Sequence, residues 1–234
     1  MSDPSNSEAT LDSNFIEAIK IMKENDVPYW VCHGTLLGLI RDGNLIPWDH
    51  DIDFGIWSGS FSKISLIEMM VANGFSLKDD GADYDFVSFT KGDSREIDFN
   101  FYHVTPETDI AFSEWTISKS KFATLVKVVA KKTSYAGKFS GLVKFLFIFS
   151  PLASALYHIL MRFGLAYVSA GYTTPASLLR DTKYIELEGL RIKVPSRHDE
   201  VLEFLYGEDW KIPKEQYNWI TESPSTRISD SRFS

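Results

Sequence analysis

Three aspartates, Asp49, Asp51 and Asp53, alternate with less polar residues in a segment that follows Pro47. Successive side chains of a β-strand point to opposite faces, so the three carboxylates would share one face and repel one another unless a cation lay between them. All-oxygen ligation favours a hard cation such as Mg²⁺ or Mn²⁺, and Mg²⁺ fills its shell with water and phosphate oxygens. The spacing therefore predicts a metal site for a nucleotide diphosphate. The alternative is the solvated face of an edge strand.

A glycine and a threonine precede the aspartates, at a position where a strand runs into a short helix. Gly34 tolerates a close backbone approach, and the N–H and hydroxyl of Thr35 could face a phosphate at the helix N-terminus. Arg41, at the end of the same helix, could pair with phosphate directly, although a surface cation is an equally good interpretation. These three residues are the predicted substrate-binding residues.

A fourth carboxylate, Asp98, lies in a second predicted strand. Glu96, Asp98 and Asn100 alternate with apolar residues there, as expected if this strand lies beside Asp51 and Asp53 in one sheet. A single nearby carboxylate is what an acceptor hydroxyl needs as a general base, so Asp98 is the candidate base or a second-metal ligand. Asp49 could be a metal ligand or could support one.

The elements that must position these residues form an α+β pattern, which predicts a mixed sheet flanked by helices. Helices are predicted at residues 11–25, 35–41, 61–72, 121–132, 141–167 and 197–206, the last capped by Ser196. Strands are predicted at residues 28–32, 49–57, 75–78, 84–90 and 95–102, with a hairpin at 182–194. The Ser-rich tail after Ile220 is expected to be mobile.

Residues 34–57, GTLLGLIRDGNLIPWDHDIDFGIW, resemble the motif of the LicD/fukutin family, including its spacing. Asp98 matches a further family aspartate, and the closing segments LEGLRIKVP and LEFLYGEDWKIP also resemble the family. The resemblance covers residues 15–105 and 183–217, and His33 departs from it because many members have Gly there. It implies a nucleotidyltransferase-like fold in a single domain, residues 1–234.

The resemblance implies transfer of a phospho-alcohol, such as phosphocholine, ribitol phosphate or glycerol phosphate, from a CDP-activated donor to a glycan or lipid-linked glycan. Asp51 and Asp53, helped by Asp49, would hold Mg²⁺ or Mn²⁺, and Asp98 would act as the base. Three alternatives remain open: a nucleotidyltransferase that releases pyrophosphate, a glycosyltransferase, and a non-catalytic scaffold at a membrane.

The charge of the chain is unevenly divided. The sequence has 24 basic and 32 acidic residues, a net charge of −8, which argues against nucleic acid as a partner. Residues 115–180 nevertheless contain nine basic residues and no acidic one. This segment has no family motif and is predicted to be a helical insertion.

Within that insertion, residues 145–161 form a charge-free apolar run that is shorter than the roughly 20 residues of a membrane span. Three interpretations remain open. Residues 141–167 could be a buried helical hairpin, residues 138–170 could lie in the headgroup region of a membrane, or the positive stretch could bind a polyanionic acceptor. Residues 1–15 lack the apolar core of a secretory leader, and Cys32 has no cysteine partner. We therefore expect a cytoplasmic protein, which could also bind peripherally to the inner face of a membrane.

Overall fold

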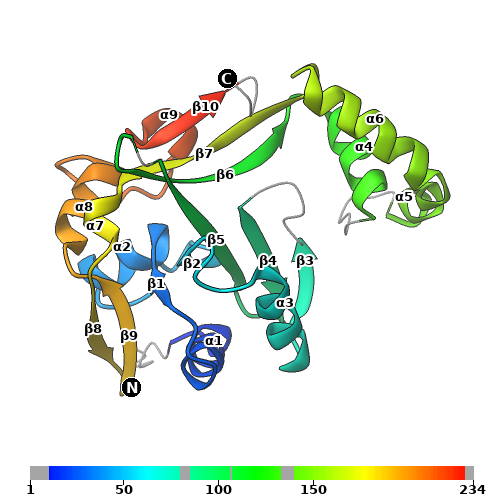
Figure 1. Cartoon of the computed structure of the whole chain (residues 1–234). Helices are drawn as coiled ribbons and strands as arrows, with labels where there is room; N and C mark the ends of the chain where they lie inside the picture. The colour runs from blue at the N-terminus through cyan, green and yellow to red at the C-terminus, as the bar shows by residue number, and fades with distance from the viewer. Residues whose placement is uncertain (1–10, 80–84, 106, 133–139, 230–234) are drawn as a thin grey trace, which may run out of the picture.

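The computed structural model of the chain describes residues 11–79, 85–105, 107–132 and 140–229 (Figure 1). Its helices are α1 (Ser13–Glu24), α2 (His33–Arg41), α3 (Lys63–Ala72), α4 (Lys121–Lys131), α5 (Ser140–Leu146), the 3-10 helix η1 (Phe147–Phe149), α6 (Ser150–Arg162), α7 (Ala176–Leu179), α8 (His198–Tyr206) and α9 (Trp219–Glu222). Its strands are β1 (Tyr29–Val31), β2 (Asp51–Trp57), β3 (Ser76–Asp79), β4 (Phe86–Thr90), β5 (Glu96–Thr105), β6 (Ile110–Ser118), β7 (Tyr167–Pro175), β8 (Thr182–Leu187), β9 (Leu190–Pro195) and β10 (Thr226–Ser229). The predicted α+β fold is confirmed.

One long strand joins two parts of the main sheet. β5 pairs in parallel with β2 and antiparallel with β4, and its last residues pair with β6. β1 extends the sheet beyond β2, and β3 extends it beyond β4. On the other side β6, β7 and β10 follow in antiparallel order, while β8 and β9 form a separate hairpin. β5 therefore connects the part of the sheet that carries the aspartates to the β6–β7 ribbon.

The two faces of β2 and β5 differ as the alternation predicts. Ile52, Phe54 and Phe99 are fully buried on one face, where the ring of Phe15 in α1 stacks on Phe54 at 6.0 Å between centroids. Asp53 and Asp98 are register partners and lie on the opposite face. The hydrophobic core thus lies on the side covered by α1 and α3, and it leaves the acidic face to the other side of the sheet (Figure 1).

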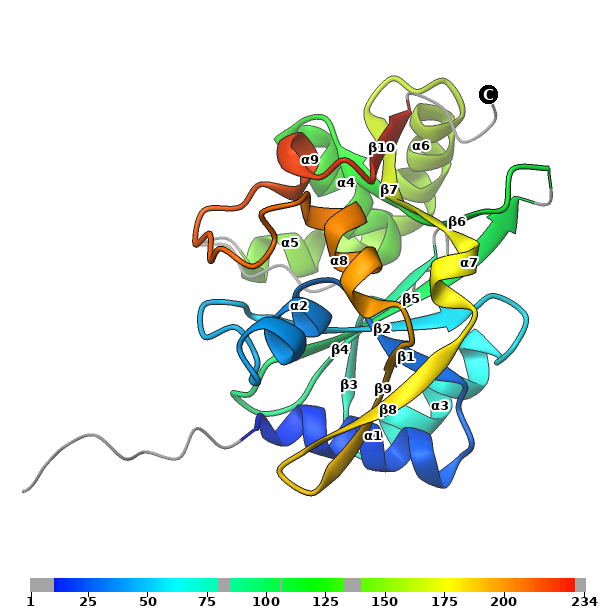
Figure 2. The same cartoon turned by 90° about the vertical axis from the view of Figure 1, so that its left-hand side faces the viewer.

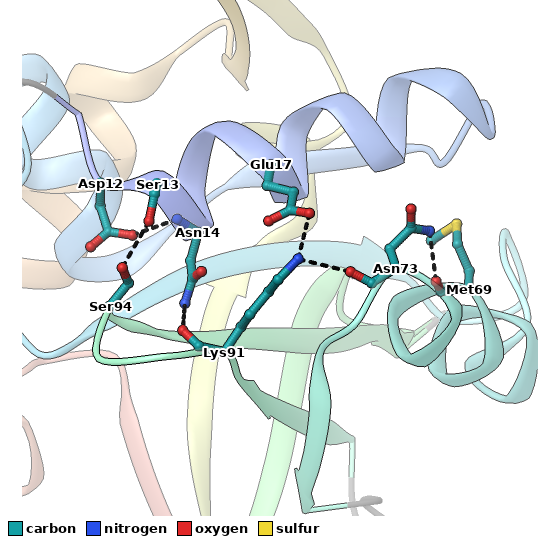
Figure 3. Close-up of polar contacts among 8 residues, drawn as sticks. All are labelled: Asp12, Ser13, Asn14, Glu17, Met69, Asn73, Lys91 and Ser94. Carbon is teal, nitrogen blue, oxygen red and sulfur yellow. Dashed lines mark hydrogen bonds and ion pairs between the residues drawn. The ribbon is translucent and has the colours of Figure 1, made fainter.

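Polar contacts hold α1 against the sheet and α3 (Figure 3). The Asp12 side chain caps the helix by accepting from the Asn14 backbone N–H at 2.8 Å, and the Asn14 amide donates to the Lys91 carbonyl at 2.9 Å. The Lys91 ammonium contacts Glu17 at 2.6 Å and donates to the Asn73 carbonyl at 2.9 Å. Lys91 therefore joins α1 to the end of α3.

The local pattern misplaced two boundaries. The predicted strand at residues 49–57 starts at Asp51, because the Asp49 N–H donates to the Ile46 carbonyl at 3.1 Å and closes a turn after Pro47. The cap of α8 is Arg197, which makes no side-chain capping bond, so the expected cap Ser196 is wrong.

Three strands were absent from the prediction. β6 and β7 pair along nine registered positions, and β10 adds an outer strand to β7. The expectation of a mobile tail after Ile220 is wrong for Thr226–Ser229, which are paired with Ser169–Tyr172 through the register of β10 and β7. Each of these strands pairs with a segment distant in sequence, and none shows the strict alternation of apolar and polar residues that would predict a strand.

The helices α4, α5, η1 and α6, within residues 121–132 and 140–162, form a helical arm that lies beyond one end of the β6–β7 ribbon (Figure 1). The insertion predicted at residues 115–180 therefore begins in β6 and ends after β7 and the short helix α7, so it is only partly helical. The stretch Gly141–Arg162 is by length and composition able to cross a membrane, and 17% of its most apolar window is buried. The interpretation of this stretch as a buried hairpin is therefore wrong. Residues 138–139 of the predicted membrane segment, and residues 1–10 of the segment predicted to lack a secretory leader, lie outside the described residues.

Candidate active site

A pocket of about 580 Å³ lies over the acidic face of the sheet. Its walls come from α2, β2, β4, β5, β6, β7 and α8 and from the chain after α8, which Figure 2 shows passing above α2. A volume of this size suits a small-molecule or nucleotide ligand. The pocket therefore draws side chains from segments that are more than 150 residues apart in sequence, such as Gly34 and Tyr217.

All four predicted carboxylates line this pocket. Asp51 and Asp53 come from β2, Asp98 comes from β5, and Asp49 comes from the turn before β2. Asp53 and Asp98 lie side by side because they are partners in the parallel β2–β5 ladder. The expected juxtaposition of Asp98 with the β2 aspartates is therefore present, although Asp49 reaches the site from outside the strand.

Burial and the charges of neighbouring carboxylates disfavour ionisation of Asp49, Asp53 and Asp98. Burial, followed by the charge of Asp51, raises the pKa of Asp49 to about 7. Burial also raises the pKa of Asp53, and the charges of Asp51 and Asp98 raise it further. The pKa of Asp98 rises to about 7, chiefly through burial, while the neighbouring Ser88 hydroxyl opposes the shift. A cation among these groups would supply the opposite charge that they lack.

The Thr35 hydroxyl contacts the backbone of β2. Its side chain is 2% exposed and lies behind the pocket wall, where the hydroxyl accepts a 2.8 Å hydrogen bond from the Asp53 backbone N–H. The Cys32 N–H donates to the Asp53 carbonyl at 3.1 Å. Both contacts fix the start of α2 to β2 at Asp53, so the Thr35 hydroxyl positions a carboxylate, and contact of Thr35 with a phosphate stays a prediction.

Gly34 lines the pocket, and the Asp49 side chain approaches it too closely for any larger residue to fit there. A Cβ atom at this position would lie 2.2 Å from Oδ2 of Asp49, far inside van der Waals contact. The expected close approach to Gly34 is therefore made by the Asp49 side chain. The glycine allows Asp49 to rest against the first turn of α2 and still line the pocket.

Arg41 also lines the pocket, with its side chain 7% exposed. Its Nε donates to Asp42 Oδ1 at 2.8 Å and its terminal NH2 group donates to Oδ2 at 2.7 Å. This bidentate pair keeps the guanidinium at the pocket wall. Binding of a phosphate by Arg41 stays a prediction, and it would require the guanidinium to share or exchange Asp42.

Two polar neighbours of the carboxylates were not predicted as site residues. The Asn100 amide donates to Asp53 Oδ1 at 3.1 Å, and the alternation that pointed to Asp98 also places Asn100 on this face. His33 lines the pocket, and its Nε2 lies 2.9 Å from the Tyr102 hydroxyl. Burial lowers the pKa of His33 to about 3, so this imidazole is neutral.

An aromatic wall lines the same pocket as the carboxylates. It consists of Trp115, Tyr172, Tyr206, Trp210 and Tyr217. The rings of Trp115 and Tyr172 lie 5.3 Å apart, and those of Tyr206 and Tyr217 lie 5.2 Å apart. Trp115 and Tyr172 carry no sequence motif, because only the pairing of β6 with β7 brings them together.

The carboxylates of the pocket suit a hard divalent cation that keeps part of its hydration shell. Among the described residues no three His, Cys, Asp or Glu side chains form a ready-made metal cluster. Mg²⁺ seldom needs one, because it usually takes one or two carboxylates plus water and phosphate oxygens. Oδ1 of Asp98 is buried without a hydrogen-bond partner among the described residues, which is a costly state for a carboxylate oxygen unless a ligand completes it.

The part of the chain that carries the four carboxylates is similar to known proteins. A family model described as LicD/FKTN/FKRP, nucleotidyltransferase domain, matches residues 26–151, which is more than half of the chain. The matched segment contains Asp49, Asp51, Asp53 and Asp98 and ends inside the helical arm.

Individual relatives are similar over different lengths. Human ribitol-5-phosphate transferase FKTN is 24% identical over 93% of this chain, which spans 40% of that protein. Human ribitol 5-phosphate transferase FKRP is 44% identical over 39 residues, which are 17% of this chain and 8% of that protein. Mannosyltransferase regulator 14 of Saccharomyces cerevisiae is 27% identical over 62% of this chain and 16% of its own length. The chain therefore spans less than half of each of these curated relatives.

Proposed function

Because the chain belongs to the LicD/FKTN/FKRP nucleotidyltransferase-domain family, we propose that it is a metal-dependent phosphotransferase acting in glycan biosynthesis. It would move a phospho-alcohol from a CDP-activated donor to a hydroxyl of a glycan or lipid-linked glycan. The observation that carries the proposal is the meeting of four carboxylates on one pocket wall, inside the segment that matches the family. The two human relatives named as ribitol phosphate transferases support the same class of reaction.

Asp51 and Asp53 are the proposed metal ligands, with Asp49 beside them. Both ligands come from β2, whose position is fixed by its parallel pairing with β5 and by the contacts of Thr35 and Asn100 with Asp53. When bound, Mg²⁺ would neutralise charge on the diphosphate and on the leaving group. The aromatic wall offers flat faces on which a nucleobase can stack.

The proposed reaction is an in-line displacement at phosphorus. The acceptor oxygen forms a bond to the phosphorus that carries the alcohol, the bond from this phosphorus to the bridging oxygen breaks, and CMP leaves. Asp98 would take the proton of the acceptor hydroxyl, because it adjoins Asp53 and has one carboxylate oxygen that no described residue satisfies. Arg41 at the pocket wall would contact a phosphate oxygen.

The nucleotide released from each donor tests the proposal. Purified chain is incubated with Mg²⁺ and CDP-ribitol, CDP-choline, CDP-glycerol or CDP-ethanolamine, with water as the acceptor, and in parallel with nucleoside triphosphates and nucleotide sugars. We expect CMP from at least one CDP-alcohol. Pyrophosphate from a triphosphate would indicate a nucleotidyltransferase, and a nucleoside diphosphate from a nucleotide sugar would indicate a glycosyltransferase. Either result without CMP release would overturn the proposal.

Matched variants test the metal site. Asp51→Asn and Asp53→Asn should each lower CMP release about 100-fold, the usual scale for removing an electrostatic group from an active site. They should also weaken Mn²⁺ binding measured by electron paramagnetic resonance, a readout that is independent of turnover. Glu68→Gln, on the exposed surface of α3, is the control and should change neither quantity. Unchanged turnover and Mn²⁺ binding in both Asp variants would contradict the proposed ligands.

A further inference from the structure

The helical arm is built around its own small core, separate from the core under the main sheet. Its buried members are Ala123, Val126, Tyr157 and Tyr167. The Tyr167 hydroxyl donates to the Ala123 carbonyl at 2.7 Å and fixes the start of β7 to α4. This core uses one face of the α5–α6 stretch only, so the other face of that stretch has no partner among the described residues.

The uncovered face is strongly apolar. Large side chains on it are exposed, among them Leu142 at 60%, Phe145 at 63%, Ile148 at 62%, Leu152 at 72% and Ile159 at 53%. The buried positions of the same stretch, Val143, Ser150 and Tyr157, recur every seven residues. At about 100° per residue, the exposed apolar positions centre on the side of the helix opposite to these buried ones.

Cations border this apolar face, and no acidic residue lies near them in sequence. Lys144 and Arg162 are exposed and fall, at about 100° per residue, on the same edge of the apolar stripe. Each is followed by an exposed phenylalanine, Phe145 and Phe163. An exposed Lys121 is followed in the same way by Phe122. Residues 115–180 contain no Asp or Glu, so the arm has no anions of its own to pair with these cations.

The occupant that matches this chemistry is a bilayer surface that contains anionic phospholipid. An amphipathic helix with cations along its edge lies in the interface with its apolar side chains below the headgroups, where the cations meet lipid phosphate. A second copy of the arm would instead bring cations against cations. The stretch is long enough to span, but a spanning orientation would draw Lys144 and Arg162, separated by 17 residues or about 26 Å, into a hydrocarbon layer of roughly 30 Å, so the flat orientation is favoured.

We infer that the helical arm is a peripheral docking surface for an anionic membrane, with the α5–α6 stretch lying flat in the interface and Lys121, Lys144 and Arg162 contacting lipid phosphate. The inference rests on the exposed apolar face and its charge border, and it does not depend on the proposed reaction. It places the β6–β7 ribbon between the membrane and the pocket, because Ser118 and Tyr167 end the ribbon beside the arm while Trp115 and Tyr172 line the pocket.

Vesicle flotation of the full chain tests the inference. The chain should float with phosphatidylcholine vesicles that contain about 30% phosphatidylglycerol, float much less with pure phosphatidylcholine, and be released by high salt. The triple variant Phe145→Ser, Ile148→Ser, Leu152→Ser should weaken binding at least tenfold. Lys144→Glu with Arg162→Glu should abolish the preference for anionic vesicles. Ile64→Ser, which removes a 69% exposed side chain from α3, is the matched control and should bind as wild type does.

Two further measurements check that the variants are folded and locate the membrane contact on the chain. Far-ultraviolet circular dichroism checks that each variant is folded, and hydrogen exchange of the wild-type chain should show vesicle-dependent protection confined to the arm. Equal flotation of the triple variant, or resistance to extraction at alkaline pH as for a spanning helix, would overturn the inference. So would a wild-type dimer that the triple variant converts to monomer. Soluble polyphosphate could also bind the chain and displace the vesicles. If it also bound the triple variant, the cations would be assigned to a polyanionic acceptor and the inference would be overturned.

Discussion

Asp53 shows how single residues build this site. Its backbone is held from two sides, by the Thr35 hydroxyl on its N–H and by the Cys32 N–H on its carbonyl, and its carboxylate accepts from Asn100. Burial, followed by the charges of Asp51 and Asp98, raises its pKa, so ionisation of this carboxyl is disfavoured unless a cation binds beside it. The geometry is therefore prepared before any ligand binds.

Thr35→Val should reveal the positioning role of the hydroxyl. The variant keeps the shape of the side chain but leaves the buried Asp53 N–H without its 2.8 Å acceptor. We expect a loss of about 1–3 kcal/mol in the free energy of unfolding, measured with urea, together with weaker Mn²⁺ binding. Thr35→Ser restores an acceptor and should recover most of both. A variant as stable and as active as wild type would show that the contact does not matter.

Gly34→Ala should damage the site more than the fold. The added Cβ would lie 2.2 Å from Asp49 Oδ2, and the Asp49 side chain must move to relieve the clash. We expect CMP release to fall at least tenfold while the thermal unfolding midpoint changes by a few degrees. Gly141→Ala is the control, because a Cβ there meets no atom within 4 Å. Equal effects of the two substitutions on turnover would exclude a role for the close approach.

His33 should make stability depend on pH in the acid range. Burial lowers its pKa from 6.5 to about 3, so between these values the unfolded state binds more protons than the native state. Its contribution is full above pH 6.5 and is lost as the pH falls toward 3, by up to about 1.4 kcal/mol per pH unit.

His33→Gln removes this titration and serves as the comparison. The free energy of unfolding of each protein is measured with urea at pH 7 and at pH 5. The value for wild type minus the value for the variant should be about 2 kcal/mol lower at pH 5 than at pH 7. The raised pKa values of Asp49 and Asp98 act in the opposite direction, but they are common to both proteins and largely cancel in the difference. A difference that stays constant with pH would contradict a buried neutral imidazole.

At the scale of elements, the sequence allows the acidic face to be predicted because its information is local. Alternation in β2 and β5 showed which residues share a face, and the motif between α2 and β2 fixed the family resemblance. The aromatic wall could not be predicted in this way. Trp115 and Tyr172 are 57 residues apart and lie side by side only through the β6–β7 ladder, which depends on long-range pairing. Asp49 was placed in the strand because alternation cannot show a turn that closes after Pro47.

The short strand β10 offers a test at this scale. It covers the outer edge of β7, and the Ser225 carbonyl before it accepts from both the Thr173 N–H at 2.9 Å and the Thr173 hydroxyl at 3.0 Å. Truncation after Ser225 would expose the β7 edge, so we expect a fall of several degrees in the unfolding midpoint and a tendency to aggregate. Truncation after Ser229 keeps β10 and is the control. Identical melting curves for both truncations would show that the strand adds no stability.

At the scale of the whole molecule, the net charge of −8 divides between a strongly acidic body and a basic arm. The arm has its own core and joins the body through the β6–β7 ribbon, where the Lys119 N–H donates to the Ala166 carbonyl at 2.8 Å. This arrangement indicates that the body does not need the arm to form its main core.

Replacement of residues 120–165 by a short Asn-Gly turn tests this division. We expect the body to stay folded, with β6 and β7 closed as a hairpin, and to release CMP from a soluble CDP donor at the wild-type rate. Vesicle flotation should be lost. The measurements are circular dichroism, thermal unfolding and nucleotide release. Loss of folding would show that the arm and the body form one cooperative unit, and loss of turnover in a folded protein would place the arm in the reaction.

The β6–β7 ribbon has one consequence for the choice of acceptor. Three residue steps separate the pair Trp115 and Ala170 from the pair Ser118 and Tyr167, a distance of about 10 Å along the strands. If the arm rests on a bilayer, this rigid spacing fixes the height of the pocket above the lipid. The pocket would then reach only acceptor hydroxyls at a matching distance from the membrane surface. The position of a sugar along a lipid-linked chain would therefore decide whether it is modified.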